Sequence, residues 1–180
     1  MTRTDATALS GCVAAIDYTY PWDGLIARWK FAGETGWSSE WARLMWRVPA
    51  MSLLWHSCTR VVPVPVGSAR LAQRGFNQAW ELVKALQQHA PGHRPVGLSQ
   101  ALVRVRETAD QHALPRAQRL INLRDAFAPD PRHRQAVLAQ HVLLVDDVST
   151  TGATLQAAAR SLLDGGAARV SALVLARTPP

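Results

Sequence analysis

Two adjacent acids followed by a run of small, hydroxyl-bearing residues are the part of this sequence best suited to chemistry. Asp146 and Asp147 come directly after the apolar run at residues 142–145. The segment that follows them contains Ser149, Thr150, Thr151, Gly152, Ala153 and Thr154. Hydroxyl groups, backbone N–H groups and the start of a helix can together surround a phosphate, and neighbouring carboxylates accept hydrogen bonds from a diol. These residues predict a site for a sugar phosphate with free 2' and 3' hydroxyls.

Two other interpretations of the same residues stay open. The acids could bind metal ions, or the acids and threonines could form only a turn and a helix cap. One threonine would be enough for a cap, and two acids at the end of a buried strand are costly unless a ligand or cation compensates them. The sequence has no Gly-Lys-Ser/Thr phosphate loop, which argues against an ordinary ATPase.

The pattern around the acids predicts a parallel α/β sheet. A strand buried on both faces, followed by a helix and a second apolar strand, is typical of a parallel crossover, and ligands of such sheets bind beyond the carboxyl ends of the strands. The expected elements are a strand at 142–145, a turn at 146–152, a helix at 154–163 and a strand at 168–176.

Upstream residues predict further elements of the same kind. A β-branched run at 60–66 indicates a short strand that ends near Pro63, because proline cannot donate to a ladder. A loop at 67–75 should then lead into a helix at 77–89. Residues 96–105 fit either a strand or a helix. The rest of the middle third is read as polar chain at 106–115, a short helix at 116–127 and a loop at 128–134.

Tryptophans dominate the first third of the chain. Their helical spacing predicts two short amphipathic helices, at 22–29 and 37–45. It favours packing inside the fold over an aromatic platform for bases. The alternative is an apolar surface for a helicase or a second copy of the chain. The rings concerned are Trp22, Trp29, Trp37, Trp41, Trp46 and Trp55.

Composition and charge set the broad class. With 48% hydrophobic and 18% charged residues, the 180-residue chain is expected to fold as an ordinary globular protein. Its net charge of +7 comes almost wholly from arginine, since Lys30 and Lys84 are the only lysines. This bias favours anionic partners, although a GC-rich coding sequence would produce it too.

Cys12 and Cys58 form no CxxC pair, so neither structural zinc nor a disulfide is expected. No leader or membrane-length apolar run is visible, and a cytoplasmic location is expected.

The run VLLVDDVSTTGATL at 142–155 resembles the signature of type I phosphoribosyltransferases that binds 5-phosphoribosyl-1-pyrophosphate (PRPP). More narrowly, the chain is similar to the ComF/GntX group, and the resemblance extends from about residue 18 to residue 177. The supporting motifs are VPVP at 62–65, RGFNQA at 74–79, Gln111, RLINL at 119–123 and LAR at 175–177.

This resemblance implies a parallel sheet flanked by helices, with a small N-terminal helical hood at 1–58 and a PRPP-binding core at 59–180 that carries a flexible loop around 104–134. It implies that Asp146 and Asp147 bind the ribose and that residues 149–154 surround the 5'-phosphate. Arg70 and Arg74 would face the pyrophosphate, with solvated loop arginines as the alternative. Arg104 and Arg106 would act with Gln111 when the flexible loop closes.

The implied reaction is transfer of the phosphoribosyl group from PRPP to a nucleophile, with release of pyrophosphate. Mg²⁺ would arrive with PRPP, and Asp146 is the candidate protein ligand. No residue indicates which acceptor is used. The alternative is a non-catalytic module in DNA uptake or utilisation, which binds single-stranded DNA through the arginines of 104–134 or acts through a helicase partner. Members of the group commonly open with a four-cysteine zinc ribbon, so we expect that the ribbon was lost or lies upstream of the assigned start.

Overall fold

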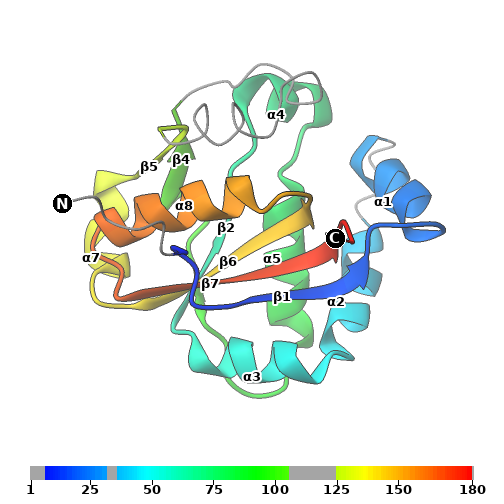
Figure 1. The fold of residues 1–180 in the computed structure, drawn as a ribbon, viewed down its shortest axis with the longest axis horizontal. Coiled ribbons are helices and arrows are strands. Elements are labelled where there is room, and N and C mark those ends of the chain that lie inside the picture. Colours follow the sequence, from blue (N-terminus) through cyan, green and yellow to red (C-terminus); the bar gives the residue numbers. More distant parts are fainter. Residues whose placement is uncertain (1–6, 32–35, 106–124, 180) are drawn as a thin grey trace.

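A five-stranded parallel sheet organises the chain in the computed structural model, which describes residues 7–31, 36–105 and 125–179 (Figure 1). The strand order is β1-β7-β6-β2-β3, and every neighbouring pair is parallel. These strands are β1 (Cys12–Asp17), β2 (Arg60–Pro63), β3 (Val96–Gly97), β6 (His141–Ser149) and β7 (Arg169–Arg177). A second, antiparallel sheet pairs β4 (Leu102–Arg104) with β5 (Phe127–Pro129).

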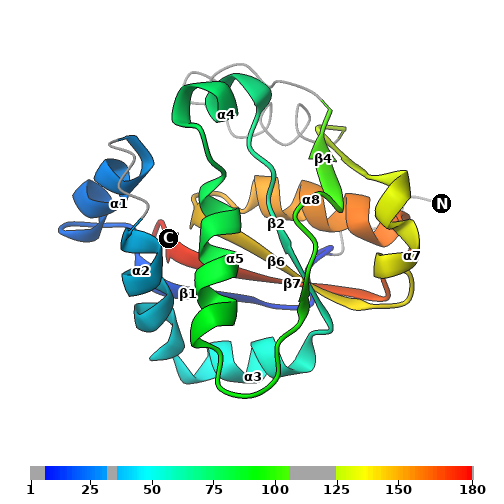
Figure 2. The same ribbon diagram turned by 180° about the vertical axis from the view of Figure 1, so that it is seen from behind.

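Helices cover both faces of the sheet, as Figures 1 and 2 show from opposite sides. One face packs against α8, with β4 and β5 beside it, and the other packs against α5 and the three helices α1 to α3. In the described ranges, every helix is too short or too polar to span a bilayer. The helices are α1 (Trp22–Phe31), α2 (Trp37–Trp46), α3 (Pro49–Ser57), α4 (Ser68–Arg74), α5 (Gln78–His89), the 3-10 helix η2 (Pro131–His133), α7 (Arg134–Val137) and α8 (Ala153–Asp164).

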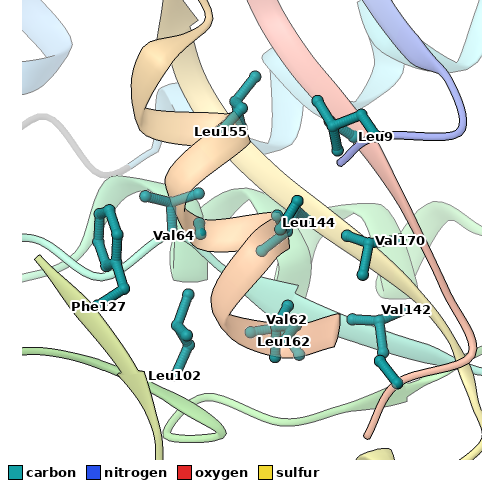
Figure 3. Packing of buried hydrophobic residues seen from close by; sticks show 14 of the residues in the cluster. Leu9, Val62, Val64, Leu102, Phe127, Val142, Leu144, Leu155, Leu162 and Val170 are labelled. Atoms are coloured by element: carbon teal, nitrogen blue, oxygen red, sulfur yellow. The ribbon is translucent and has the colours of Figure 1, made fainter. Parts of the chain in front are cut away.

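The apolar run at 142–145 of β6 is continuous because side chains on both faces of this strand are buried. Val142 and Leu144 pack on the α8 side, where Figure 3 shows them among the residues of the core cluster. Leu143 and Val145 pack on the opposite side, against the cluster built on α1 to α3 and α5. All four side chains are fully buried. The parallel α/β sheet expected from the sequence is therefore confirmed, with both faces of its central strand covered.

Several expected elements are confirmed at their boundaries. Strand β2 ends at Pro63, and β7 lies where the last apolar strand was expected. Helix α5 begins after Asn77, whose side chain accepts a hydrogen bond from the Ala79 N–H at 2.9 Å. Helix α8 begins at Ala153, one residue earlier than expected. The spacing of apolar residues in these segments is regular, and this spacing can be recognised in the sequence without knowledge of tertiary contacts.

Other expectations are corrected. Strand β6 continues to Ser149, so the two acids lie within the strand and not in a turn. Helix α4 occupies most of the expected loop at 67–75, and η2 lies in the expected loop at 128–134. The segment 1–58, expected to be a helical hood, also contributes β1 to the edge of the main sheet. Short or partly exposed elements such as these carry little periodicity, so pairing and packing decide them.

The middle of the chain is described only in part. Residues 96–105, for which strand and helix both fitted, contain β3 and β4. The expected helix at 116–127 lies mostly outside the described residues, and its last position, Phe127, begins β5. Of the flexible loop expected around 104–134, residues 106–124 lie outside the described part.

The tryptophans pack inside the fold. Trp29, Trp41 and Trp55 are no more than 2% exposed. Trp22, Trp37 and Trp46 are partly buried against the same cluster, and the rings of Trp37 and Trp41 stack at a centroid distance of 5.5 Å. The packing interpretation is confirmed, and a role of the partly exposed rings in binding a partner stays a prediction.

A carboxylate at the start of η2 makes stability depend on acid pH. Asp130 accepts hydrogen bonds from the backbone N–H and the guanidinium of Arg132, which lowers its pKa to about 2. An aspartate in an unfolded chain has a pKa of about 3.9, so the stabilising contribution is present above about pH 4 and is lost as pH falls toward 2. We expect Asp130→Asn to flatten the stability profile over this window, measured by urea unfolding from pH 2 to 7. The exposed Asp164, changed to Asn, is the control; an equal change in both variants would contradict the prediction.

Candidate functional site

The carboxyl end of β6 and the start of α8 bring the predicted site residues together (Figure 1). Asp146 and Asp147 lie three and two residues before the end of the strand at Ser149. The chain then turns through Thr150, Thr151 and Gly152 before α8 begins. The side chains of the two threonines are exposed, while Ser149 is buried. The hydroxyl-rich loop therefore lies between the acids and the N-terminus of a helix, as a phosphate site requires.

Alternation along β6 sends the two acids to opposite faces of the sheet. Asp147 continues the side of Leu143 and Val145, where its Oδ1 forms a 2.9 Å ion pair with Nζ of Lys30 on α1. Asp146 continues the α8 side, where Arg104 on β4 lies near enough for its charge to affect the carboxyl. Lys30 thus pairs directly with Asp147 and also acts on Asp146, to which β4 adds the charge of Arg104.

The described residues engage one oxygen of each acid. Oδ1 of Asp146 accepts the Asp147 N–H at 2.9 Å, and Oδ1 of Asp147 accepts the Val148 N–H in addition to the Lys30 ammonium. Within the described part of the chain, Oδ2 of both acids has no hydrogen-bond partner. Both carboxylates are therefore held in place while one oxygen of each remains available to a hydroxyl donor.

The two acids do not ionise independently. Burial of Asp146, and then the negative charge of Asp147, raise its pKa well above that of an ordinary aspartate. The Asp147 N–H and the cations of Lys30 and Arg104 act in the opposite direction. The pair therefore resists carrying two full negative charges, which eases the approach of an anionic ligand.

One arginine from α4, Arg74, lies close enough to Asp147 for their charges to interact. The guanidinium of Arg74 lies 4.8 Å from the centre of the Phe31 ring, and its Nε is buried without a partner among the described residues. Desolvation lowers the pKa of Arg74, the charge of Asp147 raises it, and Arg70 lowers it further. The structure thus brings Arg74 to Asp147, with Arg70 next to Arg74 on the same helix, whereas Arg106 and Gln111 lie outside the described residues.

With this geometry in view, similarity to known proteins decides the family. The sequence model of the family described as "Phosphoribosyl transferase domain" matches residues 51–179. The chain belongs to this family. Within the phosphoribosyltransferases its curated relatives place it in the ComF group, which agrees with the resemblance of its motifs. Helices α1 and α2 precede the matched segment.

Three relatives illustrate the group. "DNA utilization protein YhgH" of Salmonella typhimurium is 38% identical over 169 residues, which cover 92% of this chain and 71% of that protein. "Competence protein F" of Haemophilus influenzae is 30% identical over 163 residues, which cover 89% of this chain and 69% of that protein. "Competence protein ComFC" of Bacillus subtilis is 36% identical over 119 residues, covering 66% of this chain and 44% of the relative.

The oxygen donors of this phosphoribosyltransferase-type site fit a metal that enters with its ligand. Among the described residues, no group of three or more histidine, cysteine, aspartate or glutamate side chains could hold a metal ion. Mg²⁺ commonly binds one or two carboxylates and completes its shell with substrate phosphates and water. Asp146 and Asp147 supply carboxylates of this kind, and the described part of the chain builds no cage from protein ligands alone.

Lys30 and Phe31 are the site residues that sequence reasoning missed. Both lie in the last turn of α1, far from the acids in sequence, and no motif marks either of them. Asn77 belongs to the RGFNQA motif at 74–79, but only the structure shows which groups its side chain contacts. Its Nδ2 donates to the Val64 carbonyl at 3.2 Å, which ties the start of α5 to the exit of β2.

Gly152, in the loop between β6 and α8, has a left-handed backbone with φ of 75°. We expect Gly152→Ala to lower the free energy of unfolding by about 1 kcal/mol, because a Cβ is strained in this region. No heavy atom lies within 4 Å of the added Cβ, so the cost is conformational and not a clash. Gly152→Asn should cost less, since asparagine tolerates this region. Urea unfolding of both variants tests the order, and equal losses would contradict it.

Proposed function

We propose that this chain binds PRPP at the end of β6 and transfers its phosphoribosyl group to a nucleophile, with release of pyrophosphate. One observation carries the proposal: two acids, whose Oδ2 atoms have no hydrogen-bond partner among the described residues, lie one short loop away from a helix that starts without a side-chain cap. Such a corner is complementary to a diol at one end and a phosphate at the other.

Different residues are proposed to bind different groups of PRPP. Asp146 and Asp147 would accept hydrogen bonds from the 2' and 3' hydroxyls, and residues 149–154 would bind the 5'-phosphate. The first turn of α8 suits this role, because its N–H groups have no intrahelical acceptor and the helix dipole favours an anion. The nearest local acceptor, Thr151 Oγ1, lies 3.4 Å from the Ala153 nitrogen, which is long for a hydrogen bond.

Arginines would stabilise the leaving group. As the bond from C1 to the pyrophosphate oxygen breaks and the bond to the nucleophile forms, negative charge grows on the pyrophosphate. Arg70 and Arg74 from α4 are proposed to bind it, and Arg104 and Arg106 are proposed to act on the reacting centre. Asp146 is the candidate protein ligand for Mg²⁺, which would supply positive charge against the leaving pyrophosphate. The acceptor is left unassigned.

A titration with PRPP and Mg²⁺ tests the proposal. A ligand that binds only the folded state stabilises it by about 2.7 kcal/mol at one hundred times its Kd, so the melting temperature should rise with PRPP concentration. Inorganic phosphate at the same ionic strength is the control. Pyrophosphate release with nucleobases or amines then tests the transfer step. No shift at millimolar PRPP would overturn the binding proposal.

A second proposed function is a non-catalytic role in DNA utilisation or competence. The names of the relatives favour it, and the net charge of +7 suits a nucleic acid. In this version the PRPP-type fold would bind single-stranded DNA directly or act through a helicase. Binding to an oligonucleotide that weakens steeply with salt, together with no pyrophosphate release for any acceptor, would favour this role over the enzyme.

A further inference from the structure

The ion pair between Lys30 and Asp147 differs from the other lysine pair of the chain. Its two side chains are only 16% and 14% exposed, and the Nζ–Oδ1 distance is 2.9 Å. The second lysine, Lys84, forms a 2.8 Å pair with Glu81 one turn away on α5, where its side chain is 51% exposed. Exposed pairs of that kind contribute little, whereas solvent screens the Lys30 pair less. Lys84 therefore serves as a control for Lys30, because both form a lysine–carboxylate pair but only the Lys30 pair is largely buried.

The ammonium of Lys30 restricts how the Asp147 carboxylate can turn. Oδ1 is held from two sides, by Nζ of Lys30 and by the Val148 N–H. The terminal torsion of an aspartate is otherwise broad, so the carboxylate would rotate more freely without the ammonium. Arg74, whose charge also acts on Asp147, could then draw Oδ2 toward itself. Lys30 thus keeps Oδ2 available to a ligand.

Helix α1 reaches the site through two neighbouring residues. Lys30 pairs with the acid on β6, and the Phe31 ring lies against the guanidinium of Arg74 at 4.8 Å. Both residues lie before residue 51, where the match to the family begins. Helix α1, which precedes the matched segment, therefore contacts Asp147, proposed to bind the sugar, and Arg74, proposed to bind the pyrophosphate.

We propose that Lys30 is a positioning residue that makes the site selective for the hydroxyls of a ribose. It orients Asp147 so that Oδ2 accepts a hydrogen bond from the sugar, and it does not bind the 5'-phosphate. The inference rests on the proposed binding of PRPP at this corner. Its signature is a loss of affinity that depends on hydroxyl groups in the ligand.

Two ligands and three variants test the role. Ribose 5-phosphate carries both the phosphate and the hydroxyls, whereas methyl phosphate carries only the phosphate. Lys30→Met keeps the apolar stem and removes the ammonium, so ribose 5-phosphate should bind about tenfold more weakly and methyl phosphate within about twofold of the unchanged protein. Lys30→Arg should restore most of the affinity for ribose 5-phosphate. Lys84→Met, the matched control, should alter neither ligand.

The outcomes separate the two proposals. If the unchanged protein binds neither ribose 5-phosphate nor PRPP, the proposed function itself fails. If it binds them and Lys30→Met keeps the same preference for ribose 5-phosphate over methyl phosphate, the positioning role is overturned. Equal loss of both ligands would indicate a structural role only, and would also overturn it. A melting curve checks folding, and Lys30→Gln replaces the methionine variant if that variant does not fold.

Discussion

Asp147→Asn is expected to weaken PRPP binding by about tenfold to a hundredfold, because a hydrogen bond to a charged acceptor contributes about 1.5–3 kcal/mol. The amide has one oxygen and a donor where the carboxylate has two acceptors, and its ion pair with Lys30 is lost. Calorimetry with Mg²⁺ at fixed ionic strength measures the change. The melting temperature without ligand separates this effect from any loss of stability.

Asp164→Asn provides the control for that experiment. Asp164 is an exposed acid at the end of α8, remote in sequence from the loop at the other end of the helix. The substitution changes the net charge by the same amount, so it reports any general electrostatic effect on an anionic ligand. PRPP affinity that is unchanged in Asp147→Asn, or reduced equally in both variants, would contradict the assignment of Asp147 to the ribose.

Trp55→Ala is expected to lower the free energy of unfolding by about 3–5 kcal/mol, the usual cost of removing a large buried aromatic ring. Trp55 is fully buried on α3 and meets Trp46 edge to face at a centroid distance of 5.5 Å. Its indole N–H donates to the His93 carbonyl at 3.0 Å, so the substitution also leaves that carbonyl without this donor. Urea unfolding followed by circular dichroism measures the loss.

Leu53→Ala is the matched control on the same helix. The Leu53 side chain is 77% exposed, and surface substitutions of this type usually change stability by less than about 0.5 kcal/mol. If both variants were destabilised equally, burial of Trp55 in the core would not explain the effect. If neither changed, the buried position of Trp55 would be wrong.

Local patterns predicted the elements that pack on both sides of the sheet. The apolar run of β6, the stripe of α5 and the start of α8 each carry a clear period, and the structure places them within a residue or a few of the expected limits. Pro63 ends β2 for a backbone reason that needs no tertiary contact. The group of residues from Asp146 to Thr154 was likewise predictable, because it is continuous in sequence.

Elements that depend on distant partners were not predictable. Strand β1 is a partly exposed edge strand whose place is defined by pairing with β7, the last strand of the chain. Its small residues carry no alternating pattern strong enough to indicate a strand. Helix α4 has no buried side chain, so it lacks the apolar stripe by which a helix is recognised.

Sequence by itself determined the chemistry at the end of β6, since two acids, a hydroxyl-rich turn and a helix start stand in one unbroken run. Only the tertiary structure decided that Asp146 and Asp147 face opposite sides of the sheet and which cations meet them. Lys30, Arg74 and Arg104 come from three separate segments. Their approach depends on how α1, α4 and β4 pack against the sheet, and long-range burial of this kind leaves no periodic trace in the sequence around each cation.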